Sequence, residues 1–314
     1  MLVNLVPDFL AVLKAGDRVA AYRDYVDRHR PVLAAYWHNY VLDLDGPHAD
    51  EVIRRTVSAD RRDLLAMLHE VDLHAVCEEA LATALRLFEA DRPVDCYVMV
   101  GVGAANAGEL VVGGRGIGFV CAEHFTGRSN PETLGLGLSP TVLPLWIAHE
   151  VAHAVRYTSP RSQSEFNRVI AESGGYYDYW ETGTRIPLLE QLVNEGLAVQ
   201  GSMAADPGHP VWDYYGYSRR QYRRVRELDS FLRHATAPDF GRAGLGLRLR
   251  YLSAGMSPTA RRVAGKVLPE RAGYYLGAQL ASPLAERQGI ARALRAAPDE
   301  FLKADLAAHR IESA

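Results

Sequence analysis

The sequence has few of the features that would direct a protein out of the cytoplasm or into a membrane. Its three cysteines, Cys77, Cys96 and Cys121, are odd in number and widely spaced, which favours reduced core thiols over a disulfide framework or a CxxC metal site. No run reaches the roughly 18 apolar residues of a membrane-spanning helix. Residues 1–13 lack the basic start and sustained apolar run of a secretory signal. We therefore expect a cytoplasmic protein without a membrane span.

An excess of charge of one sign is also missing. The 314 residues include 35 Lys and Arg against 38 Asp and Glu, a formal net charge of -3. Such a chain has no overall field that would attract nucleic acid, and we do not expect nucleic acid as a partner. The basic cluster at residues 219–226 is followed by Glu227 and Asp229 and is interpreted as a solvated helix face.

Signatures of two common enzyme classes are absent as well. No Gly-x-Ser-x-Gly string marks a serine hydrolase nucleophile. The glycine-rich residues 101–108 follow a predicted strand but lead into another strand, whereas a dinucleotide-binding turn leads into a helix. A glycine-rich hairpin is the favoured interpretation of this segment.

What the chain does have is 48% hydrophobic residues, enough for a large core, in three successive patterns. A helical spacing of apolar residues runs from about residue 7 to 93. Short β-like runs follow at residues 96–100, 109–112 and 117–121, and predict a small antiparallel sheet. The helical pattern returns near residue 141 and continues to the end. This order favours a mostly helical α+β fold, with an N-terminal helical region at residues 1–93 and a second domain at residues 94–314.

The most informative motif is HEVAH at residues 149–153, within a stretch of helical character. Residues four apart share a helix face, so the imidazoles of His149 and His153 can converge on one zinc ion at about 2.0–2.1 Å, with Glu150 beside them. The flanks are apolar on all sides, and buried ionisable groups are costly unless paired or bound to metal. A pair of satisfied core histidines is the alternative.

A catalytic zinc site usually has three protein ligands, so a third is expected downstream. The best candidate is Glu195, a carboxylate among apolar neighbours in a second helical pattern, with 41 residues between it and His153. Glu190 and Glu172 are weaker rivals. Glu190 lies near the start of its helix, where a solvated carboxylate facing the helix dipole is the ordinary expectation.

With these residues in place, the sequence resembles the gluzincin metallopeptidases, in which a glutamate on a later helix completes an HExxH site. NEGLA at residues 194–198 is similar to the Asn-Glu-Gly-Phe-Ala string of the aminopeptidase branch. A nearer likeness is to a family of uncharacterised bacterial proteins predicted to be zinc-dependent proteases, which carry HExxH, Glu-Gly-Leu-Ala and an Ala-Gly-Tyr segment similar to residues 272–274. The resemblance covers about residues 95–290 and implies a zincin-like domain.

The resemblance also implies roles: one zinc ion per chain held by His149, His153 and Glu195, Glu150 as general base, and Tyr274 as hydrogen-bond donor to the oxyanion. Such a site would hydrolyse peptide bonds of a peptide or protein substrate with metal-activated water. Tyr275 is the immediate alternative to Tyr274, because consecutive helical residues point about 100° apart. A packing role is the other reading of both tyrosines.

Further residues are candidates for supporting or substrate-lining roles. Asn194 precedes the third ligand, and Arg156 lies one turn beyond His153, where it would anchor a ligand carboxylate or simply complement the helix dipole. His124 and the aromatic residues in 176–180 are candidates to line a substrate cleft, although the aromatics are expected mainly to pack.

In the gluzincin fold an edge strand pairs with an extended substrate, and residues 109–121 stand where that strand is expected. The Gly-x-Met-Glu-Asn string that anchors a free amino terminus in the aminopeptidase branch is absent. The alternatives to a peptidase are a zinc-containing regulatory or binding protein and a zinc hydrolase of a non-peptide amide.

Overall fold

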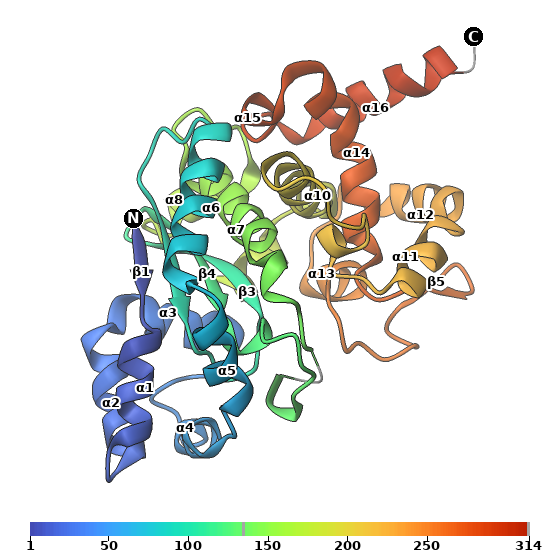
Figure 1. The fold of residues 1–314 in the computed structure, drawn as a ribbon. Helices are drawn as coiled ribbons and strands as arrows, with labels where there is room; N and C mark the ends of the chain where they lie inside the picture. Colours follow the sequence, from blue (N-terminus) through green and yellow to red (C-terminus); the bar gives the residue numbers. More distant parts are fainter. Residues whose placement is uncertain (134–135, 313–314) are drawn as a thin grey trace.

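A four-stranded sheet in the left half of Figure 1 forms the frame on which the central helices pack. The computed structural model describes residues 1–133 and 136–312. The strands are β1 (Leu2–Asn4), β2 (Val94–Met99), β3 (Ala107–Val112) and β4 (Arg115–Cys121), in the spatial order β1-β2-β4-β3. The predicted strands in the middle of the chain are confirmed, as is the mostly helical α+β fold. The sequence analysis missed β1, which at three residues is too short to show a pattern.

The expected antiparallel pairing was wrong for most of the sheet, which is mixed. Only β3 and β4 pair antiparallel, whereas β1 with β2 and β2 with β4 are parallel. The tight turn at residues 113–114 joins β3 to β4 as a hairpin, and β3 takes the outer position. As a result β4 returns beside β2 in the same direction, and β3 becomes an edge strand.

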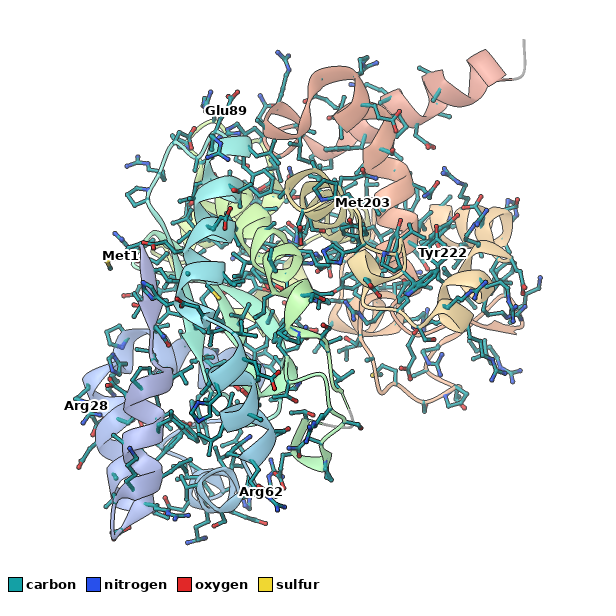
Figure 2. All side chains as sticks on the ribbon, in the orientation of Figure 1. Met1, Arg28, Arg62, Glu89, Met203 and Tyr222 are labelled. Carbon is teal, nitrogen blue, oxygen red and sulfur yellow. The ribbon has the colours of Figure 1, made fainter. Side chains whose placement is uncertain are left out.

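Six helices precede β2 in the chain. They are α1 (Val6–Lys14), α2 (Arg18–Arg28), α3 (Arg30–Tyr40), α4 (Ala49–Ser58), α5 (Arg62–Glu70) and α6 (Leu73–Leu87). Asp17 and Asp72 cap α2 and α6 by accepting hydrogen bonds from backbone N–H groups of the first turn. Met1 and Arg28 lie at the outer side of this region in Figure 2.

The expected division at residue 93 remains a prediction. β1 belongs to the same sheet as the strands that follow residue 93. One apolar cluster also includes Phe9 and Trp37 from the early helices together with Ile147 and Leu192 from the later ones.

The remainder of the chain is helical apart from a small hairpin. Its helices are α7 (Leu143–Thr158), α8 (Glu165–Glu172), α9 (Tyr179–Arg185), α10 (Leu188–Ala205), α11 (Arg219–Arg226), α12 (Asp229–Thr236), α13 (Leu245–Leu252), α14 (Ala272–Gln288), α15 (Ile290–Ala293) and α16 (Pro298–Glu312), and its strands are β5 (Arg262–Val263) and β6 (Lys266–Val267). α7 packs against the sheet, and α10 lies between α7 and α14. Both α7 and α10 are buried on nearly every side, which explains their apolar flanks.

Glycines set how closely these layers approach. A Cβ on Gly118 of β4 would lie 3.0 Å from Cβ of Glu150, so its absence lets α7 rest directly on the sheet. A Cβ on Gly196 of α10 would lie 2.1 Å from the backbone of Gly277 in α14, and one on Gly277 would meet Leu192 in the same way. The backbones of α10 and α14 therefore touch, which brings the first turn of α14 close to Glu195.

Within the described residues, no helix combines the length and the apolar character needed to cross a membrane.

Candidate metal centre

The helix α7 brings the two histidines of the HEVAH motif together. The imidazole centroids of His149 and His153 are 5.0 Å apart, and each residue is only 2% exposed. Pro144 in the first turn suits a helix start, because the N–H that proline lacks has no partner inside the helix there. The predicted pairing of these side chains on one helix face is confirmed.

Glu195 on α10 completes the group. Its Oε2 lies 3.5 Å from Nε2 of His149 and 3.6 Å from Nε2 of His153. Charge-assisted hydrogen bonds are shorter, about 2.7–2.9 Å, and this buried oxygen has no hydrogen-bond partner among the described residues. Ligands at about 2.0–2.1 Å from a tetrahedral zinc ion are roughly 3.4 Å from one another. The donor set and its spacing thus fit one metal ion.

Glu195 supplies the negative charge that would favour a cation at this site. Burial opposes ionisation of Glu195, but His153 and His149 outweigh it and hold the pKa of the carboxyl well below its usual value. Burial likewise disfavours the charged form of His153, yet Glu195 raises the pKa of that imidazole to about 9. Burial lowers the pKa of His149. A proton on His153 and a metal ion would compete for the same ring nitrogen.

Glu150 and a second carboxylate, Glu109 of β3, lie on the sheet side of this group. Oxygens of both residues and a ring nitrogen of His153 fall within 4.8 Å of one another. Glu109 lies opposite Gly118 in the β3–β4 pairing. Because Gly118 has no Cβ, α7 packs closely on the sheet there, and the Glu109 side chain can approach Glu150. Burial raises the pKa of Glu150 well above its usual value, and the charges of Glu109 and Glu195 add to the shift. A carboxylate with a raised pKa accepts a proton readily near neutral pH.

A chain of hydrogen bonds holds Glu109. Tyr40 donates to its Oε2 at 3.0 Å, and Tyr157 donates to its Oε1 at 3.2 Å. The side-chain amide of Asn194 in turn donates to the Tyr157 hydroxyl at 2.9 Å. Asn194 therefore helps to position the Glu109 carboxylate, through its hydrogen bond to Tyr157.

The structure separates the two neighbouring tyrosines of α14. Tyr274 stacks on the His149 ring at 6.1 Å between centroids. It lines the same cavity as His149, His153 and Glu195, which we call the metal group. Tyr275 faces away and packs against Tyr215 and Tyr222.

Two of the other acidic candidates lie outside the group. Glu190 is fully buried, and the expectation of a solvated carboxylate was wrong for it, because Arg156 donates to both of its oxygens at 2.9 and 3.0 Å. Arg156 also donates to the backbone oxygens of Leu294 and Ala296, so its carboxylate partner is Glu190 and not Glu195. Glu172 lies in surface ion pairs with arginines.

A cavity of about 550 Å³ opens onto the metal group. His149, Glu150, His153 and Glu195 line it together with the loop that precedes β3, the start of α14 and residues of α13. His124 is buried in its wall, and neither ring nitrogen has a hydrogen-bond partner among the described residues. Burial lowers the pKa of His124 to about 4.

The aromatic residues at 176–180 divide between packing and lining. Tyr177 is buried in a small apolar cluster beside α8. Tyr179 and Trp180 line the cavity, whereas Tyr176 is exposed. The expectation that these side chains mainly pack describes Tyr177, and in part Tyr179, which also packs against that cluster.

The free edge of β3 is already partly occupied. The Tyr40 hydroxyl accepts from the Glu109 backbone N–H and shares its single proton between the C=O and Oε2 of that residue, and the Tyr177 N–H donates to the Val111 C=O. Backbone pairing with a substrate would be restricted to the start of the strand at Ala107, which lines the cavity.

Sequence reasoning missed Glu109 and Arg271 as residues of this site. Glu109 had a signal, since it is the single carboxylate in an apolar strand run. Arg271 directly precedes the predicted tyrosine motif, but an arginine at a helix start carries no pattern of its own. Its guanidinium carbon lies 4.1 Å from the Tyr274 ring centroid.

Comparisons of this chain with protein-family models, with curated proteins and with solved structures found no match.

Proposed function

We propose that this protein is a zinc-dependent peptidase in which His149, His153 and Glu195 bind one zinc ion. The supporting observation is the position of the Glu195 carboxylate, whose Oε2 is nearly equidistant from the two Nε2 atoms at 3.5 and 3.6 Å and has no hydrogen-bond donor among the described residues. A zinc ion bound there supplies a Lewis acid that polarises a carbonyl and lowers the pKa of water to about 7.

The protein side chains would carry the proton transfers. Glu150 would take the proton of the attacking water and pass it to the leaving amine, a role that suits its raised pKa. The Tyr274 hydroxyl would donate a hydrogen bond to the oxyanion that develops on the scissile carbonyl. The cavity in front of both residues is large enough for a short peptide segment.

The deciding experiment separates metal binding from turnover. The Glu150→Gln variant should keep stoichiometric zinc and lose hydrolysis of a mixed peptide library by about 10²–10⁴-fold, because proton transfer is removed while the ligands remain. Zinc is measured by metal analysis and cleavage by mass spectrometry. Glu172→Gln is the matched control, since this carboxylate lies in surface ion pairs and should change neither readout.

Other outcomes would identify the alternatives. Unchanged turnover in Glu150→Gln would rule out the assigned base. A wild-type protein that holds zinc, cleaves no peptide and unfolds on His149→Ala substitution would be a structural zinc protein. Hydrolysis of simple amides without peptide cleavage, lost in Glu150→Gln, would identify an amidase. A protein that binds no zinc would refute the proposal.

A further inference from the structure

Arg271 lines the cavity, and the ring of Tyr274 lies between its guanidinium and His149 of the metal group. Its guanidinium carbon is 4.1 Å from the Tyr274 ring centroid and 5.9 Å from that of Trp146. Tyr274 stacks in turn on His149 at 6.1 Å. Extended peptide spans about 3.3–3.6 Å per residue, so a group bound at Arg271 belongs within about three residues of a carbonyl bound at the metal group.

The surrounding structure holds this arginine in place. Arg271 has a left-handed backbone with φ of 55°, a conformation that costs a non-glycine residue about 1–3 kcal/mol. The Tyr217 hydroxyl donates to its backbone oxygen at 2.5 Å. Gly216 leaves room for the side chain, since a Cβ there would lie 2.8 Å from Nη1 of Arg271 and 3.1 Å from Trp146.

Arg271 differs from the buried Arg156 and Arg248, because no carboxylate or backbone oxygen is paired with it in the described part of the chain. Arg156 is paired with Glu190, and Arg248 donates to Tyr179 O, Thr182 Oγ1 and the Tyr177 hydroxyl.

Glu270, which precedes Arg271 in the chain, pairs with Arg261. In the described part of the chain no carboxylate lies within ion-pair distance of Arg271, whose side-chain partner is the Tyr274 hydroxyl.

We propose that Arg271 binds a carboxylate of the substrate, so that the enzyme prefers peptides with a negative charge within about three residues of the cleaved bond. This inference rests on the proposed peptidase function. A guanidinium presents planar paired donors that match a carboxylate. Glu109 and Glu150 make the sheet side of the cavity acidic, so an anionic group is directed toward the α14 side, where Arg271 lies. The carboxylate would be either the C-terminal carboxylate or the side chain of Asp or Glu.

Matched peptides test this preference and identify the source of the carboxylate. A mixed hexapeptide library is prepared as free acids and as C-terminal amides, and internal positions carry either Asp and Glu or Asn and Gln. With the zinc-loaded wild-type protein, kcat/KM should be about 10–100-fold higher for one anionic form, the size expected for a charge-assisted hydrogen bond. Preference for free acids identifies the C-terminal carboxylate, and preference for internal Asp or Glu identifies a side chain.

In the Arg271→Gln variant, kcat/KM for the anionic peptides should fall close to kcat/KM for the neutral peptides, so that their ratio is near one. Arg271→Lys should keep part of the preference for the anionic peptides. A purely structural role would lower both rates and leave the ratio unchanged, which would overturn the inference. Arg219→Gln is the control, because Arg219 is an exposed arginine over Trp212 outside the cavity, and it should keep the wild-type ratio.

The two proposals fail in distinguishable ways. Cleavage by the wild-type protein without any charge preference would refute the role of Arg271 and leave the peptidase standing. Zinc binding without cleavage of any form would refute the peptidase. In that case, equal binding of acetyl-trialanine and its amide to the zinc-loaded protein, measured by calorimetry, would refute the carboxylate site as well.

Discussion

Of the polar contacts that join α7 to α10 in the described residues, the two that involve glutamates differ in how their hydrogen bonds are satisfied. In the first, Arg156 meets Glu190 with donors to both carboxylate oxygens and to two backbone oxygens. In the second, His149 and His153 face Glu195 at 3.5 and 3.6 Å, and no described residue donates a hydrogen bond to Oε2 of Glu195. The residues of both contacts are buried.

The difference separates a structural ion pair from a ligand site. A buried charge pair persists when its hydrogen bonds are complete, as in the contact of Arg156 with Glu190. A buried carboxylate oxygen without a donor is costly, and it is stable where a cation completes the group. Of the two carboxylates on α10, the one with unsatisfied bonding is therefore the candidate ligand.

Breaking the satisfied contact should give the largest loss of stability. Glu190→Gln leaves the charge of Arg156 buried without its partner, and we expect the free energy of unfolding in urea to fall by about 3–5 kcal/mol. The double variant Arg156→Met/Glu190→Leu should recover most of the loss, because neither charge remains. Zinc content in the folded fraction should stay at the wild-type level. If Glu190→Gln lost zinc and kept nearly all of its stability, Glu190 would be the metal ligand and not the partner of a structural ion pair.

Breaking the unsatisfied contact should instead remove the response to metal. In Glu195→Gln the metal-free protein should unfold at a lower temperature than wild type at neutral pH, because the charge interaction of Glu195 with His153 is lost. The stabilisation by zinc, about 2.7 kcal/mol at a free concentration one hundred times Kd, should be lost. Thermal unfolding with added zinc and with chelator measures both quantities. Equal stabilisation of variant and wild type by zinc would exclude Glu195 as a ligand.

A pH-dependent effect is expected at His124, a buried imidazole whose ring nitrogens have no hydrogen-bond partner among the described residues and whose Nε2 lies 3.9 Å from a Glu123 oxygen. The unfolded chain takes up a proton at this residue below about pH 6.5, whereas in the folded protein the pKa of His124 is about 4. The contribution of the neutral His124 to the free energy of unfolding is therefore fully present above pH 6.5. It falls as the pH drops toward 4, by up to about 1.4 kcal/mol per pH unit. His124→Phe should flatten the dependence in urea unfolding curves measured across that range, and an unchanged slope would contradict the assignment.

The sequence predicted the parts of the site that depend on local spacing. His149 and His153 converge because a helix places residues four apart on one face. Glu195 was identifiable as a carboxylate inside an apolar helical pattern, where solvation could not explain it. The strands of the sheet were recognisable from their β-branched runs, but their pairing was not, because β4 lies beside β2 only once β3 has taken the outer position.

Long-range contacts decided the rest, and no local pattern records them. The sequence could not distinguish a solvated Glu190 from a buried one, since its partner Arg156 lies 34 positions away on another helix. Tyr274 and Tyr275 are equivalent as a pattern, and only the contact of Gly196 with Gly277 brings one of them over the metal group.

The sequence by itself thus determined the helices, the HEVAH pair and the types of side chain that could bind a metal, because these follow from the period of a helix and the cost of burying charge. The tertiary structure alone decided that Glu109 reaches Glu150 across Gly118 and that Arg271 lies beside Tyr274, with no carboxylate of the described residues paired to it. These relations arise where separate elements pack together, and a single chain pattern does not encode which surfaces meet.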